Sequence, residues 1–144
     1  MENSKGKEYA NKNNLIFEGD YYDGIKFGNG KEYNGSGKII FEGEYLNGLK
    51  NGKGKEYDKN DKLIFEGEYL NGERNGKGKE YNDHGKLIFE GEYLKGERWS
   101  GKRKEYYENG KLKFEGEYVK GERNGKGKEY YLDGEIKFEG EYIP

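Results

Sequence analysis

Residues 63–81 read LIFEGEYLNGERNGKGKEY, and a closely similar stretch returns about every 24 residues along the chain. Its most regular part is Phe-Glu-Gly-Glu-Tyr, in which Asp20 replaces the second Glu in the first copy. The copies begin at Phe17, Phe41, Phe65, Phe89, Phe114 and Phe138. A fixed period of this length is typical of stacked supersecondary units, so the repeat decides the fold.

Each repeat contains two segments that favour β-strands. Residues 63–70 and 77–81 carry aromatic or β-branched side chains and are bounded by Asn, Gly and Asp. Residues 71–76 are predicted to join them, because Asn and Gly tolerate the positive φ of tight turns. We therefore expect an all-β fold, an elongated single-layer twisted antiparallel meander of 24-residue β-hairpin repeats. Residues 1–144 are expected to form one array of about six hairpin units, the last incomplete.

Alternation of side chains along a strand predicts which residues pack together. Phe65, Gly67 and Tyr69 share one face, and the glycine leaves a notch for aromatic side chains of adjoining strands. The ladder residues of this face are Phe17, Phe41, Phe65, Phe89, Phe114, Phe138, Tyr21, Tyr45, Tyr69, Tyr93, Tyr118, Tyr142, Gly19, Gly43, Gly67, Gly91, Gly116 and Gly140. A third aromatic ladder is Tyr9, Tyr33, Tyr57, Tyr81, Tyr106 and Tyr130. These ladders hold most of the Phe and Tyr residues, which predicts that the rings form the core rather than a ligand site.

The composition indicates a folded but unusually polar chain. Hydrophobic residues make up 30% and charged residues 39%, values that alone favour disorder. A net charge of only -2 and an aromatic content of 16% oppose disorder. A repeat array tolerates such polarity, because each unit needs to bury only a stripe against its neighbours.

Residue types that carry catalysis or hold cofactors are missing or unsuitably arranged. The chain has no Cys, which excludes cysteine metal sites, and His84 is its single histidine, in a predicted turn. The pair Glu66 and Glu68 recurs along the repeats, which indicates a solvated charged face rather than an acid-base pair. Gly-x-Gly motifs such as residues 52–54 are not followed by a helix that could hold phosphate. We therefore expect no enzyme activity, no cofactor and no metal site.

Charge and hydropathy also limit the partners. No apolar run approaches the roughly 20 residues needed to cross a bilayer, and residues 1–6 lack the apolar part of a signal peptide. We expect a cytoplasmic protein, with peripheral attachment to a membrane left open. The 27 Lys and Arg against 29 Asp and Glu give no basic excess for nucleic acid. Residues 98–104 hold four basic side chains, at the lower limit for anionic lipid, so lipid stays an alternative partner.

The repeat resembles the MORN repeat. The likeness lies in the order aromatic-x-Gly-x-aromatic, then Gly, then Gly-x-Gly, at Phe65, Gly67, Tyr69, Gly72, Gly76 and Gly78. It recurs in the repeats that start at Phe17, Phe41 and Phe114. Residues 106–112 also resemble the bacterial YwqK-type antitoxin-like variant of the repeat. The resemblance implies a single-layer sheet of hairpins that serves as a scaffold or assembly module, with lipid-headgroup binding or an antitoxin-like or immunity-like role as alternatives.

The repetition breaks at two places, which supply the candidate partner-binding residues Phe27, Arg98, Trp99 and Arg103. Trp99 is the single tryptophan and lies where one repeat gains a residue, and Phe27 replaces an asparagine found in other repeats. Both aromatics are predicted to lie in the same inter-strand loop, three repeats apart. Since Trp and Arg are favoured at interface hot spots, a protein partner is expected, with self-association as a further expectation. The alternative is that Trp99 packs on a neighbouring loop.

Overall fold

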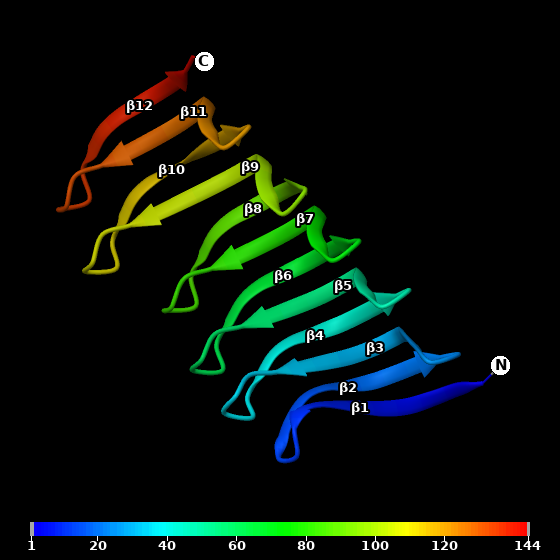
Figure 1. Ribbon diagram of the computed structural model, residues 1–144. Coiled ribbons are helices and arrows are strands. Elements are labelled where there is room, and N and C mark those ends of the chain that lie inside the picture. Colours follow the sequence, from blue (N-terminus) through cyan, green and yellow to red (C-terminus); the bar gives the residue numbers. More distant parts are fainter. Residues whose placement is uncertain (1, 144) are drawn as a thin grey trace.

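A computed structural model describes residues 2–143 and confirms the predicted all-β meander. Twelve strands form one open antiparallel sheet in which every strand pairs with its neighbours in sequence, so the array is elongated (Figure 1). The strands are β1 (Asn3–Asn11), β2 (Asn14–Tyr22), β3 (Ile25–Tyr33), β4 (Ile39–Leu46), β5 (Leu49–Tyr57), β6 (Leu63–Leu70), β7 (Glu73–Tyr81), β8 (Leu87–Leu94), β9 (Glu97–Tyr106), β10 (Leu112–Val119), β11 (Glu122–Tyr130) and β12 (Ile136–Tyr142).

Two kinds of turn alternate along the array. On one edge a two-residue turn such as Asn71-Gly72 closes the hairpin with positive φ at both positions, 50° and 90°. On the other edge a longer turn is held by an Asn or Asp, as where the Asn82 side-chain oxygen accepts hydrogen bonds from the amides of His84 and Lys86, both at 3.0 Å.

The predicted connection at 71–76 is wrong in its length. Only Asn71 and Gly72 form the turn, and β7 already begins at Glu73. Residues 75–77 form a bulge opposite Glu68, because Tyr69 pairs with Arg74 while Gly67 pairs with Gly78. Because the turns are shorter than predicted, Phe27 lies in β3 and Trp99 lies in β9. The prediction that both aromatics lie in a loop is therefore wrong.

The core is a row of enclosed phenylalanines on one face of the sheet. Phe65 is fully buried, with Tyr69 of its own strand at 5.7 Å and Tyr93 of the next repeat at 5.2 Å, both edge-on. The Arg74 guanidinium lies 4.0 Å above the same ring. The Phe65 ring is thus enclosed although the sheet has a single layer. At the array's last strand, the Phe138 ring is 40% exposed and the prediction that it belongs to the core is wrong.

A polar network covers these rings. The Tyr69 hydroxyl donates a hydrogen bond to Glu56, and Arg74 binds the same carboxylate through Nε at 2.9 Å and Nη2 at 3.0 Å. Burial alone would raise the pKa of Glu56, but the hydrogen bonds from Arg74 and Tyr69 outweigh it and lower that pKa. The carboxylate therefore stays ionised and holds the tyrosine and arginine over the phenylalanines.

Glycines allow the strands to approach, although the predicted notch lies elsewhere. A Cβ on Gly78 would meet the rings of Phe65 at 2.7 Å and Tyr93 at 2.9 Å, so adjoining aromatic rings fill the space over this glycine. A Cβ on Gly67 would instead meet backbone, the Gly78 Cα and the Lys77 carbonyl oxygen, each at 2.6 Å. The notch for neighbouring rings is thus in the Gly-x-Gly strand, and Gly67 is required by close backbone packing.

The prediction that the third aromatic ladder is core is wrong. Within β7, Gly78 and Glu80 face the phenylalanines, so Tyr81 points to the opposite face by alternation. Tyr81 is half-buried there and its hydroxyl donates a hydrogen bond to Glu66 at 2.6 Å. Tyr9, the first member, is 53% exposed. Four members of this ladder bind glutamates on the outer face rather than filling the core: Tyr33, Tyr57, Tyr81 and Tyr130.

This arrangement predicts a loss of stability in alkali. Partial burial, followed by hydrogen bonding to glutamates, raises the pKa of Tyr33, Tyr57 and Tyr81 to about 12. Unfolded tyrosines ionise near pH 10, so the folded state binds more protons above that pH and stability should fall as pH rises from about 10 to 12. Tyrosinate absorbance and thermal melts across this range measure both effects. In a Glu66→Gln variant the midpoint for Tyr81 should move part of the way back, and uniform titration near pH 10 would contradict the assignment.

Candidate functional site

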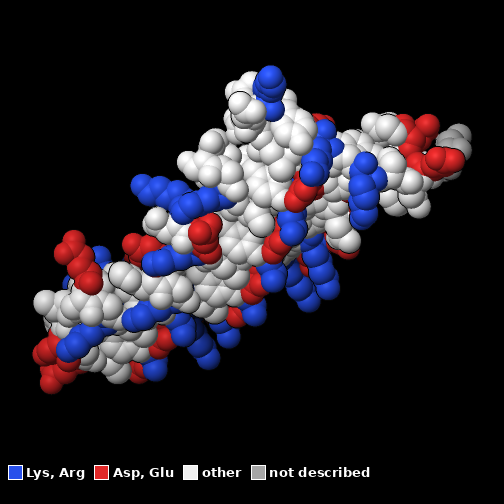
Figure 2. Space-filling view, turned by 90° about the horizontal axis from the view of Figure 1, so that it is seen from below, with Lys and Arg blue, Asp and Glu red and all other residues white. Residues whose placement is uncertain are grey.

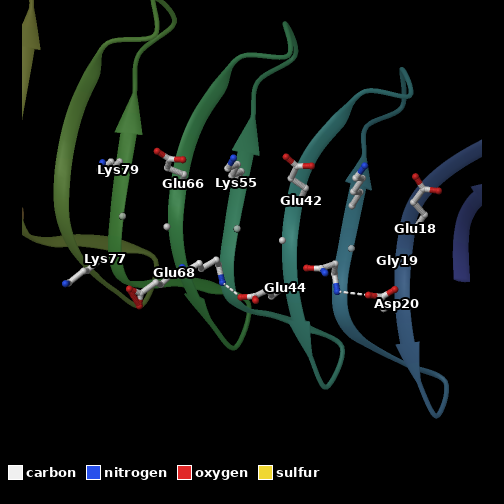
Figure 3. A pocket seen from close by; sticks show the side chains of 18 of the residues that line it. Glu18, Gly19, Asp20, Glu42, Glu44, Lys55, Glu66, Glu68, Lys77 and Lys79 are labelled. Carbon is white, nitrogen blue, oxygen red and sulfur yellow. Dashed lines mark hydrogen bonds between the residues drawn. The ribbon is translucent and has the colours of Figure 1, made fainter. Parts of the chain in front are cut away.

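The face opposite the phenylalanines is hollowed into a long groove. On each strand from β1 to β8 a glycine lies between two polar residues, as in Lys77-Gly78-Lys79, so the glycine forms the floor and its neighbours the walls. Figure 3 shows one wall with Lys79, Glu66, Lys55, Glu42 and Glu18, and the other with Lys77, Glu68, Glu44 and Asp20. The groove has a volume of about 1430 Å³ and crosses eight strands.

The walls of the groove alternate in sign from strand to strand. Odd-numbered strands supply lysines and even-numbered strands supply carboxylates, so basic and acidic bands follow one another, with Asn29 as the neutral exception. A carboxylate in the wall that contains Glu44 is held by a bulge in the neighbouring strand. Glu44 accepts a hydrogen bond from the Lys53 amide of that bulge at 2.6 Å. Cross-strand ion pairs such as Lys79–Glu90 at 3.6 Å stay half exposed to solvent.

The alternation extends over much of the surface. Figure 2 shows basic and acidic side chains mixed along the array, without a region of one sign on the face in view. Because neighbouring charges of opposite sign cancel at distance, this face offers little long-range attraction for a polyanion.

A second surface lies beside the groove, along the edge with the two-residue turns. There the large apolar side chains next to each turn point away from the phenylalanine core and are 39–51% exposed. This apolar row consists of Tyr22, Ile25, Phe27, Leu46, Leu49, Leu70, Leu94, Trp99 and Val119. It continues from hairpin to hairpin, since a methyl of Ile25 lies 3.8 Å from the Cβ position of Gly48 in the next turn.

The four predicted partner-binding residues do not form one site. Phe27 and Trp99 belong to the apolar row and are 46% and 41% exposed. Arg98 instead binds Glu80 and lies 5.1 Å over the Phe89 ring, and Arg103 lies 5.2 Å over the Tyr118 ring. Strand alternation explains the split, because Arg98 and Trp99 are adjacent and must point to opposite faces.

The extra residue near Trp99 shifts the register of the sheet. Gly91 of β8 pairs with Gly101, whereas Gly116 of β10 pairs with Arg103. The glycine row is therefore displaced by two residues at β9, roughly 7 Å along the strand, and the groove ends at β8. Among the described residues, the buried Tyr93 hydroxyl has no hydrogen-bond partner.

The sequence interpretation missed the groove, although its signal was present. The triplets charged-Gly-charged, such as Glu66-Gly67-Glu68 and Lys77-Gly78-Lys79, predict a glycine floor between two walls once the strands are in register.

The described residues contain no group of three metal-ligating side chains. Residues 2–143 contain no helix that is long and apolar enough to span a membrane.

Comparison with known protein families gives two matches. The model of the MORN repeat matches residues 17–39, 41–62, 65–86 and 114–136, which together make up more than half of the chain. The model of the MORN repeat variant matches residues 99–120, the region that contains Trp99 and the displaced register. A search among curated proteins gives no match.

Proposed function

The chain belongs to the MORN repeat family, and we propose that it is a non-catalytic protein-interaction or scaffold module. The observation that carries the proposal is the apolar row, in which nine large side chains stay 39–51% exposed along one edge. Scattered exposed apolar residues are normal, but rows of them with polar surroundings mark interaction sites. The long array presents many such contacts on one scaffold, which suits a protein partner or another copy of the chain.

Phospholipid binding is the competing function. The apolar row could contact a membrane, but the alternating charges beside it give no basic cluster of the kind that binds anionic lipid. An antitoxin-like or immunity-like role is a special case of protein binding and needs the same contact surface. Sedimentation with anionic vesicles separates lipid binding from both.

Trp99→Ala tests the interaction function. Because truncation of an aromatic hot spot at an interface typically costs about 2 kcal/mol or more, partner affinity should fall more than about tenfold. Proteins captured by the intact chain are compared with those captured by the Trp99→Ala variant, and the affinity of each captured protein is then measured.

Leu132→Ala is the matched control, since Leu132 is 57% exposed but lies outside the apolar row. Its captured partners should be unchanged, and both variants should keep the parent's melting temperature. Unfolding of the Trp99→Ala variant would make Trp99 a packing residue. If the Trp99→Ala variant captured the same proteins with the same affinity as the parent, Trp99 of the apolar row would not contribute to binding.

A further inference from the structure

We propose that the groove binds an extended segment of a partner polypeptide in which acidic and basic side chains alternate, with like charges three residues apart. This inference deepens the proposed protein-binding function and rests on it. Four features of the groove support it. The backbone of its floor is already paired within the sheet, its width suits an extended chain, its charges recur at a fixed spacing, and its walls carry both signs.

The floor of the groove cannot recognise a ligand by adding a strand. Gly54 pairs with Gly43 on one side and Gly67 on the other, and Gly78 pairs with Gly67 and Gly91. Strand addition needs a free sheet edge, whereas the floor strands β2–β8 are paired on both sides and only β1 lies at an edge. Recognition in the groove therefore depends on the side chains of the walls.

The width of the groove suits an extended chain. The two walls come from the residues on either side of one glycine, such as Lys77 and Lys79, which are roughly 7 Å apart along the strand. An α-helix with its side chains is about 10–12 Å across and would rest on the rims. A single extended chain is narrower than a helix and can approach the glycine floor more closely, with its side chains beside the walls that Figure 3 shows.

The period of the charges selects one extended conformation. Neighbouring strands are about 4.8 Å apart, so bands of like sign recur about every 9.6 Å. Three residues of polyproline II complete one turn and rise about 9.3 Å, so every third side chain returns to the same side at nearly the band spacing. In a β-strand, side chains on one side are two residues and about 6.7 Å apart. Polyproline II therefore stays in register with the bands over the groove. From β1 to β8 the groove spans about 34 Å, which matches about 11 residues of that conformation.

The signs of the walls require a ligand with charges of both signs. The central lysine pair, Lys53 and Lys55, lies between glutamates of the two neighbouring strands. A ligand of one sign would meet repulsion at every second strand, which disfavours nucleic acid and an acidic membrane here. Lys79 and Glu90 are about half exposed and can turn from each other to a ligand. Glu66 and Glu44 keep their hydrogen bonds to Tyr81 and to the Lys53 amide and would accept further hydrogen bonds from the ligand in fixed positions.

The test uses synthetic peptides of about 12 residues, the length that the groove accommodates. One peptide repeats Glu-Lys-Pro, and the other has the same composition with all Glu, all Pro and all Lys in separate blocks. Fluorescence anisotropy with the full chain should show the repeating peptide binding about tenfold more tightly. Added salt should weaken its binding, since the contacts are between exposed charges. Equal affinities for the two peptides would overturn the proposal.

Charge reversal within the groove supplies the matched variants. The double change Lys53→Glu and Lys55→Glu turns a central basic band acidic and should abolish the preference for the repeating peptide. The same change at Lys126 and Lys128 of β11, outside the groove, should leave it intact. If the charge-reversed variant melts early, Lys53→Gln with Lys55→Gln replaces it. If the intact chain shows Trp99-dependent capture but binds the two peptides equally, the groove proposal alone fails. If it prefers the repeating peptide but its capture of partners does not depend on Trp99, the proposed function alone fails.

Discussion

Replacing Phe65 by Ala is expected to destabilise the chain by about 3–5 kcal/mol, the range for large aromatic side chains removed from a core. The ring is completely buried, and Tyr69 and Tyr93 contact it edge-on. Its removal leaves a cavity between two tyrosines of different repeats and takes the aromatic surface from beneath Arg74. The loss therefore affects two hairpins, although only one residue changes.

Phe138→Ala is the control for this prediction. Phe138 occupies the same position in its repeat but is 40% exposed, and its ring contact is with Tyr142 of its own strand. Its truncation should cost much less than that of Phe65. Urea or guanidinium unfolding of both variants gives the two free energies. Similar costs would show that enclosure by the next repeat adds little to stability.

The fold was predictable because the repeated aromatic residues indicate both how the repeats align and which side chains share a face of the sheet. The period places Phe65 and its equivalents side by side, and strand alternation puts Tyr69 on the same face as Phe65. The two-residue turns were only partly predictable. Asn-Gly signals the turn at Asn71, but the bulge at residues 75–77 depends on pairing with Glu68 and Gly67 across the hairpin.

The displaced register at β9 could not be predicted from the pattern of side chains. A slip of one residue would turn every side chain to the wrong face, but a slip of two residues keeps the faces. Gly101 and Arg103 are two residues apart, so both alignments leave Lys102 on the groove face. The choice depends on how Gly101 packs against Gly91 on one side and Arg103 over Tyr118 on the other.

The candidate site was predicted in part. The breaks in the repeat indicate Phe27 and Trp99, which the structure places in the apolar row, and whether they bind a partner stays a prediction. Arg98 and Arg103 were grouped with Trp99 by closeness in sequence, which does not determine the face on which a strand residue lies. The groove escaped notice because its walls are distributed over eight strands, with only two residues from each.

Replacing Gly67 by Val is expected to cost about 3 kcal/mol or more, although valine is the better strand former. The new Cβ would lie 2.6 Å from the Gly78 Cα and the Lys77 carbonyl oxygen and 2.8 Å from the Phe65 ring. Overpacking typically costs about 1–3 kcal/mol when side chains can yield. At this position two of the three nearest atoms are backbone, so β6 and β7 must separate where their pairing is closest.

Gly35→Val is the matched control for Gly67→Val, since Gly35 has nothing within 4 Å of its Cβ position. Its free energy of unfolding should differ from that of the parent by less than about 0.5 kcal/mol. Denaturant unfolding of both variants separates the intrinsic effect of valine from the effect of close backbone packing. If the Gly67 variant is as stable as the Gly35 variant, the two strands can part without loss and the glycine row is not required for their pairing. If only the Gly67 variant is destabilised, the repeated glycine is explained by the approach of one strand to the next.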